Sequence, residues 1–229
     1  MKIYITRHGQ PATADDDEEN PQYPSGDPPL SELGRRQARK LGERLRADSF
    51  RGEIFASPYI RTSETADIIS EVNETAFYPE PAIREVTSEN MHQFTGRKLE
   101  ELRKLFPNIA RDSRLEWPWW SMTPEVVNEL RRRPQVEERV GGFLKRIMAP
   151  EAADVLLVGH AGSFSAAVEF LMELDPKGEF AYSGLTWNCA LTEFRLNEDG
   201  LYPLYHGSVE HLEYDEITAN SRRPKDIGA

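Results

Sequence analysis

The chain has 229 residues, of which 38% are hydrophobic and 29% charged, and its formal net charge is −11. This length is enough to bury a hydrophobic core, and the acidic balance argues against a nucleic-acid-binding protein, which usually carries a basic stripe. No apolar run reaches the ~20 residues that a membrane-spanning helix needs. Cys189 is the single cysteine, which excludes an intrachain disulfide and a cysteine-based zinc site.

The N-terminus lacks the basic segment and apolar run of a signal peptide, so the sequence predicts a cytoplasmic protein that does not associate with membranes. We interpret the acidic run at 14–20 and the basic run at 130–134 as solvated surface. The acidic run lacks the ligand spacing of a calcium loop. His92, His206 and His211 lack the spacing of zinc ligands. We therefore expect neither a metal nor another cofactor.

The first elements in chain order are a strand and a helix joined by a long polar loop. Residues 2–6 (KIYIT) are apolar, β-branched and aromatic, which predicts a short buried strand. Residues 11–30 are polar and proline-rich, without apolar periodicity, and predict a loop. Residues 31–47 predict a helix that begins at Ser31, a residue type favoured at the N-cap.

A second strand and helix follow. Residues 52–56 (GEIFA) predict a strand, and the segment 57–72 predicts a helix. The pair Ser57-Pro58 indicates the helix start, because a proline at the first helical position loses no hydrogen bond. Arg61 is therefore expected near the N-terminal end of this helix.

The rest of the chain continues the alternation of strands and helices. Further helices are predicted at residues 96–106, 123–133, 134–148 and 163–174, and further strands at residues 155–158, 188–196 and 201–206. The pattern predicts an α/β protein, a three-layer α/β/α sandwich with a mostly parallel central sheet. Without an internal repeat or a break in composition, we expect one domain over residues 1–229.

Histidine and arginine residues follow the predicted strands at the point where each strand ends. Arg7 and His8 come directly after the first strand, and Gly159-His160 follows the strand at 155–158. Arg61 lies just after the strand at 52–56. Because ligands bind outside the carboxyl ends of strands in open α/β sheets, we expect these groups to meet in one crevice.

Two arginines and two histidines together indicate phosphoryl transfer. A guanidinium group matches the oxygens of a phosphate bidentately, and a neutral imidazole can form a covalent phosphoenzyme. Neighbouring guanidinium groups favour the neutral imidazole. We expect the first N–H groups of the helix after His160, including that of Ala161, to donate to the phosphate. Gly9 is expected to let the backbone turn close to the phosphate, and Gln10 beside it to bind substrate.

Each residue also has a simpler interpretation. A single histidine at a strand end is often a packing residue. Arg61, with Glu64 and Asp67 nearby in the sequence, has the pattern of a surface charge. The residues by themselves leave both interpretations open.

Several motifs in order resemble the histidine phosphatase superfamily, also called phosphoglycerate mutase-like. The matching segments are RHG at 7–9, DPPLSELGRRQARKLGERL at 27–45, ASPYIRTSETA at 56–66, AIREVTSENMHQFTGRKLEEL at 82–102, LLVGHAG at 156–162, WNCALTEF at 187–194 and VEHL at 209–212. The resemblance covers most of the chain and implies a phosphoglycerate mutase-like fold.

The resemblance also implies roles for individual residues. His8 would be the nucleophile that becomes phosphohistidine, and Arg7, Arg61 and His160 would bind the phosphoryl group. The acidic residue of the family falls on Glu85, which would donate a proton to the leaving oxygen and later activate water. Glu89, four residues further on, is the alternative to Glu85.

The sequence departs from phosphoglycerate mutases directly after RHG, where residues 10–20 replace the mutase pattern. We therefore expect a metal-independent phosphatase that acts on a small-molecule phosphomonoester or a phosphopeptide. The alternatives are mutase-type phosphotransfer and a non-catalytic phosphate- or phosphoprotein-binding module. The loop at 11–29 and the tryptophan-rich segment at 113–122 are expected to border the pocket. Neither the substrate nor the oligomeric state follows from the sequence.

Overall fold

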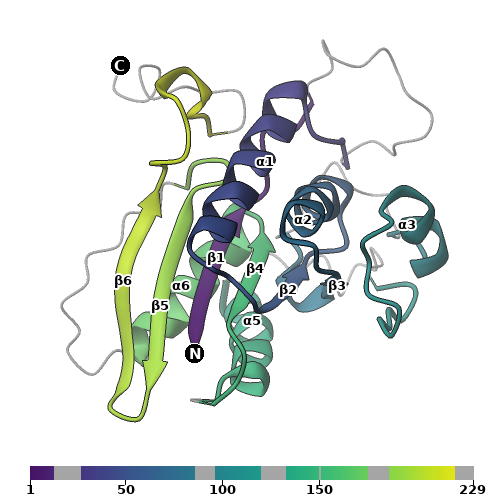
Figure 1. The fold of residues 1–229 in the computed structure, drawn as a ribbon. Helices are drawn as coiled ribbons and strands as arrows, with labels where there is room; N and C mark the ends of the chain where they lie inside the picture. Colours follow the sequence, from purple (N-terminus) through teal and green to yellow (C-terminus); the bar gives the residue numbers. More distant parts are fainter. Residues whose placement is uncertain (13–26, 86–95, 120–132, 150, 175–185, 220–229) are drawn as a thin grey trace.

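The protein is described by a computed structural model, in which residues 1–12, 27–85, 96–119, 133–149, 151–174 and 186–219 are placed. These residues form a six-stranded sheet with helices on both faces (Figure 1). The strands are β1 (Lys2–Arg7), β2 (Glu53–Ala56), β3 (Phe77–Pro79), β4 (Val155–Gly159), β5 (Leu191–Asn197) and β6 (Gly200–Ser208).

The strand order across the sheet is β3-β2-β4-β1-β5-β6. The neighbours β3/β2, β2/β4 and β4/β1 pair in parallel, whereas β5 is antiparallel to both β1 and β6. β1 and β4 lie at the centre, where both faces are covered, and this explains their nearly continuous apolar sequences. The predicted α/β architecture with a mostly parallel sheet is confirmed.

Helices cover the two faces in pairs. The helices are α1 (Glu32–Ala47), α2 (Ile60–Asn73), α3 (Leu99–Leu105), α5 (Arg133–Ile147) and α6 (Ala161–Glu173), with single 3₁₀ turns η1 (Pro81–Ile83) and η3 (Tyr214–Glu216). α1 packs against α2 and α5 against α6. In Figure 1 the first pair lies in front of the sheet and the second pair behind it.

Each face of the sheet has its own hydrophobic core, because successive side chains of a strand point to opposite faces. Tyr4 of β1 packs in the core with Leu41 of α1, whereas its neighbour Ile5 packs in the core with Phe143 of α5. The residues of β4 alternate in the same way. The sheet is therefore the middle layer of the predicted α/β/α sandwich.

Close packing of α5 on α6 explains the glycine at position 141 within α5. A Cβ at Gly141 would lie 2.8 Å from the ring of Phe170 on α6. The intrinsic cost of glycine in a helix is about 1 kcal/mol, and α5 runs through this position nevertheless. Tertiary packing outweighs the local propensity here.

Other boundaries differ from the predictions. α2 begins at Ile60 rather than at Ser57-Pro58, because Ser57 still pairs with the sheet through its N–H to Val158 O (3.1 Å). β3 was not predicted; it is only three residues long. The helix predicted at 123–133 lies, apart from Arg133, outside the described residues. The same holds for most of the predicted 11–29 loop.

Within the described ranges, no helix is both long and apolar enough to cross a lipid bilayer. The expectation of one domain over residues 1–229 stays a prediction.

Candidate active site

Three parallel strands end side by side and deliver their polar residues to one edge of the sheet. Beyond the regular strands, His8 N–H donates to Gly159 O (3.0 Å), and Ser57 N–H donates to Val158 O (3.1 Å). These bonds extend the parallel pairing by one residue, so that Arg7, His8 and His160 emerge together. With Arg61 from the first turn of α2, they form what we call the strand-end cluster.

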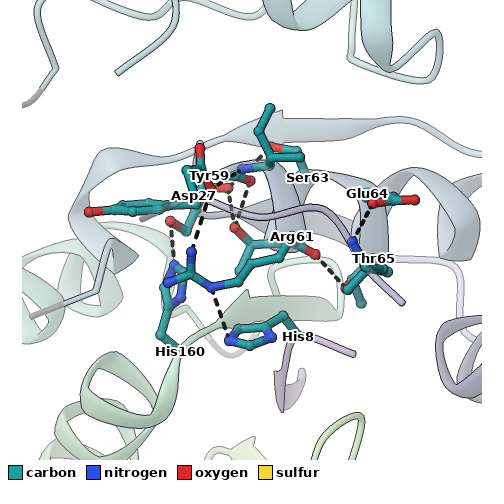
Figure 2. Close-up of polar contacts among 12 residues, drawn as sticks. His8, Asp27, Tyr59, Arg61, Ser63, Glu64, Thr65 and His160 are labelled. Atoms are coloured by element: carbon teal, nitrogen blue, oxygen red, sulfur yellow. Dashed lines mark hydrogen bonds and ion pairs between the residues drawn. The ribbon is translucent and has the colours of Figure 1, made fainter. Parts of the chain in front are cut away.

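The hydrogen bonds of His8 fix its tautomer. His8 Nδ1 lies 2.7 Å from Gly9 O, an atom that can only accept, so Nδ1 carries the proton. His8 Nε2 then has the lone pair, and it accepts from Arg61 Nε–H at 3.2 Å. Figure 2 shows the guanidinium group of Arg61 lying over this nitrogen. The lone pair on His8 Nε2 therefore faces a cation.

The surroundings keep His8 neutral. Burial, and then the cations Arg61 and Arg7, hold the pKa of His8 well below its usual value of about 6.5. The ring of His160 lies edge-on to that of His8 with centroids 5.3 Å apart, and the pKa of His160 is lowered by burial and by Arg61. Both imidazoles are uncharged at neutral pH.

Arg61 is held by a carboxylate from a distant part of the sequence. Asp27 Oδ1 accepts from Arg61 Nη1 (3.4 Å) and from Ile60 N–H (2.9 Å). Ile60 is the first residue of α2, and the N-cap residue Tyr59 provides no side-chain cap. Asp27 therefore caps α2 from outside and orients Arg61 at the same time.

Asp27 is fully enclosed, with 1% of its surface exposed, and its Oδ2 has no partner among the described residues. Burial raises the pKa of Asp27 to about 7, against the opposing effects of Arg61 and the Ile60 N–H. The segment that carries Asp27 is attached to α2 a second time, because Leu30 N–H donates to Glu64 Oε2 (2.7 Å). Asp27 thus has a fixed place behind Arg61.

Arg7 is the member of the strand-end cluster that stands at the end of β1. Its Nη1 donates to Thr186 O at 2.9 Å, and the side chain is buried. Burial lowers the pKa of Arg7, the nearby Arg61 cation lowers it further, and the carboxylate of Glu85 acts in the opposite direction. Two guanidinium groups and one carboxylate therefore share a poorly solvated space.

His160 is oriented by Ser57. His160 Nε2 lies 2.8 Å from Ser57 Oγ, and the ring packs edge-on against Tyr59 with centroids 5.0 Å apart. His160 is completely buried, and its Nδ1 has no partner within the described part of the chain. A buried nitrogen without a partner is costly, so Nδ1 is the atom available to a ligand.

The carboxylate of Glu85 lies at the N-terminus of α6, the helix that begins directly after His160. Its Oε1 accepts from Gly162 N–H at 3.2 Å. The expectation that the first N–H groups of α6 point to a phosphate therefore needs a correction at Gly162, whose N–H binds a carboxylate instead. Ala161, the first residue of α6, has an N–H that the helix itself cannot satisfy. Glu89 lies outside the described residues.

Gly9 and Gln10 make contacts that the sequence did not indicate. A Cβ at Gly9 would lie 2.5 Å from Gly34 O, so the close approach that requires glycine here is to α1. Gln10 N–H donates to Gln37 Oε1 (2.8 Å), and Gln10 O accepts from Ser31. Gln10 also lines a groove of about 450 Å³ beside α1. Substrate binding by Gln10 stays a prediction.

The structure adds Asp27, Ser57 and Tyr59 to the predicted residues. Tyr59 is fully buried between the ring of His160 and the guanidinium of Arg61, whose Cζ lies 4.8 Å from the Tyr59 centroid. Asp27 and Ser57 both stand inside the quoted motifs, DPPL and ASPY, but nothing in their local pattern reveals long-range contacts. Among the described residues, no three His, Cys, Asp or Glu side chains gather as a group that could hold a metal ion.

The arrangement fits a tetrahedral dianion. The Arg61 guanidinium contacts the Nε2 of His8, and the Arg7 cation and the His160 ring lie near the same imidazole. Charge-assisted bonds from such donors are strongest where water is excluded, as it is here.

Comparison with protein families gives one match that spans most of the chain. Residues 3–209 match the model described as the histidine phosphatase superfamily (branch 1). Comparison with curated protein sequences finds no significant match.

Solved structures of the same fold are numerous, at low sequence identity. The ecdysone phosphate phosphatase of Bombyx mori, in complex with tungstate, is 19% identical with a TM-score of 0.67, covering 100% of this chain and 99% of that one. Bacillus stearothermophilus YhfR is 23% identical with a TM-score of 0.59, covering 93% and 99%. A mycobacterial glucosyl-3-phosphoglycerate phosphatase, in complex with inorganic phosphate, is 18% identical with a TM-score of 0.58, covering 93% and 99%. These similarities establish the fold.

Proposed function

The chain belongs to the histidine phosphatase superfamily (branch 1), and from this premise we propose that it hydrolyses a phosphomonoester through a phosphohistidine on His8. One observation carries the proposal. His8 is held as the tautomer with its lone pair on Nε2, and that lone pair faces the guanidinium group of Arg61. A phosphoryl group bound by Arg61 would meet a nucleophile that is already neutral and oriented.

In the first step His8 Nε2 attacks phosphorus, and the bond to the leaving oxygen breaks. Arg7, Arg61 and the Nδ1 of His160 bind the equatorial oxygens, where charge is spread in the transition state. Glu85, in its protonated form, gives its proton to the leaving oxygen, so that an alcohol departs. Its hydrogen bond from Gly162 N–H, at the N-terminus of α6, supports this assignment.

In the second step the carboxylate of Glu85 takes a proton from water as the water attacks the phosphohistidine. The P–N bond breaks, and inorganic phosphate leaves with the neutral imidazole regenerated. The positive charge that balances the phosphoryl oxygens comes from Arg7 and Arg61, and we propose that no metal ion is needed.

The cationic donors of the strand-end cluster and the similar proteins support a proposal for the substrate class. A mycobacterial relative of this fold hydrolyses glucosyl-3-phosphoglycerate and the Bombyx mori relative ecdysone phosphate, which are small phosphomonoesters. We propose a small phosphomonoester or a phosphopeptide for this chain. The single cysteine, Cys189, is buried and unpaired, which suits a cytoplasmic location.

Trapping the intermediate tests the proposal. Wild-type protein is mixed with a radiolabelled phosphomonoester in excess chelator and denatured in alkaline detergent during turnover. We expect label that is stable to base and lost in acid, and we expect none in His8→Ala. His211→Gln serves as the control, because His211 is partly buried and its Nε2 lies 2.9 Å from Cys189 O, outside the strand-end cluster.

Label on a serine, or label that persists in His8→Ala, would contradict the mechanism. A wild-type protein that binds phosphate tightly without turnover would favour the alternative of a non-catalytic phosphate-binding module. Strict activation by a bisphosphorylated sugar acid would favour the alternative of mutase-type phosphotransfer.

A further inference from the structure

The segment that carries Glu85 has little secondary structure of its own. It leaves β3 at Glu80, makes the single 3₁₀ turn η1, and ends at Glu85; we call it the 80–85 segment. The bonds inside the turn are long, with Ile83 N–H to Glu80 O at 3.3 Å and Arg84 N–H to Pro81 O at 3.2 Å. So short a turn does not hold a side chain in place by itself.

Within the segment, Glu80 Oε1 accepts from Ala82 N–H (2.7 Å) and Arg84 Nη1 donates to Pro81 O (3.2 Å). Arg139 of α5 adds further hydrogen bonds from outside the segment. Its Nη1 donates to Pro81 O (3.2 Å), Ala82 O (2.7 Å) and Arg84 O (3.1 Å), and its Nη2 donates to Arg84 O (3.2 Å). One guanidinium group therefore binds three carbonyls of the 80–85 segment.

The bond to Arg84 O matters most for the site. This carbonyl belongs to the peptide group that joins Arg84 to Glu85, so the two nitrogens of Arg139 fix the peptide plane from which Glu85 begins. At the other end, the Glu85 carboxylate binds Gly162 N–H. Glu85 is thus held at its backbone by α5 and at its side chain by α6.

The charges around Arg139 agree with this arrangement. Burial lowers the pKa of Arg139 to about 9, with Arg84 acting in the same direction and the carboxylates of Glu85 and Glu80 opposing it. The guanidinium group is therefore charged at neutral pH. The Glu85 carboxylate therefore lies close enough to the Arg139 guanidinium to favour its charged form.

We propose that Arg139 is a positioning residue that places Glu85 for proton transfer to the leaving oxygen. The inference rests on the proposed function, because it gives Arg139 a part in the step that Glu85 performs. It acts through the backbone of the 80–85 segment and touches no reacting atom.

Leaving-group dependence tests the proposal. Dinitrophenyl phosphate releases a stable anion that needs no proton, whereas phenyl phosphate releases a more basic oxygen that does. In Arg139→Gln we expect kcat/KM for phenyl phosphate to fall about 10²-fold, since a misplacement of about 1 Å has an effect of this size. For dinitrophenyl phosphate we expect kcat/KM to fall less than about threefold, because its leaving group needs no proton.

Arg103→Gln is the matched control. Arg103 also binds two backbone carbonyls, those of Ala110 and Arg111, but at α3. Its loss should leave the ratio of the two kcat/KM values unchanged. Arg139→Lys keeps the charge but lacks the two-nitrogen fork, and we expect an intermediate ratio. This variant also gives a result if Arg139→Gln does not fold.

The outcomes separate the two proposals. If the wild type hydrolyses neither ester, the proposed function fails. If the wild type hydrolyses both esters, Glu85→Gln should change the ratio of the two kcat/KM values. If neither Arg139→Gln nor Arg139→Lys changes that ratio, only the role of Arg139 is wrong. An equal loss on both esters would also contradict it, because that is the effect of a general structural defect. In the double variant with Glu85→Gln, the Arg139 substitution should change the ratio no further.

Discussion

The strand-end cluster and the 80–85 segment meet at the same edge of the sheet, yet they are built differently. Arg7, His8 and His160 are placed by strand pairing, and the hydrogen bonds that align them belong to the sheet itself. Glu85 follows a three-residue turn whose carbonyls are bound by a side chain from α5. One region is held by regular backbone structure, whereas the other is held largely by side chains, among them the partly buried cation Arg139.

The difference corresponds to what each region must do in the proposed mechanism. The cluster binds a phosphoryl group whose shape is the same in every phosphomonoester, and rigid strand ends suit a fixed geometry. The 80–85 segment must reach a leaving group that differs between substrates. We expect changes in the cluster to affect all esters alike, and changes around Glu85 to affect esters according to their need for a proton.

The largest effect that separates the two regions should come from Arg61→Gln. We expect kcat/KM to fall about 10³-fold for phenyl and dinitrophenyl phosphate alike, because a donor to the transition-state oxygens is lost for both. The pKa of His8 should also rise toward its usual value, since the Arg61 cation helps to lower it, and NMR titration of the imidazole measures this.

Arg39→Gln is the control for Arg61→Gln. Arg39 is exposed and pairs with Glu71 away from the cluster, so both esters should react at the wild-type rate. A loss in Arg61→Gln confined to phenyl phosphate would show that the two regions are not divided as we describe.

The second effect is that of Glu85→Gln. We expect kcat/KM to fall about 10²-fold or more for phenyl phosphate and to change little for dinitrophenyl phosphate, because general acid catalysis is lost. The ratio kcat/KM reports only the steps up to departure of the leaving group, so the later role of Glu85 with water does not enter. Glu89→Gln should behave as wild type; the reverse result would move the acid to Glu89.

The smallest of the three effects should come from Asp27→Asn. We expect a loss of about tenfold on both esters, because Arg61 loses the charged partner that orients it. Asp67→Asn is the control, since Asp67 also accepts a backbone N–H, that of Asn108, away from the cluster. In the Arg61→Gln background, Asp27→Asn should lower kcat/KM no further. A full additional loss would show that Asp27 does not act through Arg61.

Much of the cluster could be predicted because its placement is a local property of the sequence. Apolar runs end directly before Arg7-His8 and before His160, and parallel strands bring their carboxyl ends to one edge. The α/β architecture follows from the alternation of strand and helix patterns in the same way. The start of α2 could not be predicted as accurately. Ser57 still pairs with β4, and the side chain that caps α2 belongs to Asp27, which is far away in the sequence.

The sequence by itself therefore determined the alternation of strands and helices apart from β3, the two histidines at strand ends and the arginine after the second strand. These depend on apolar periodicity and on neighbours along the chain. Only the tertiary structure decided the tautomer of His8, the partner of Arg61 and the support of Glu85 by Arg139. Each of these depends on a hydrogen bond between segments that are distant in sequence or on exclusion of water from a buried charge. A pattern of neighbouring residues carries no information about either.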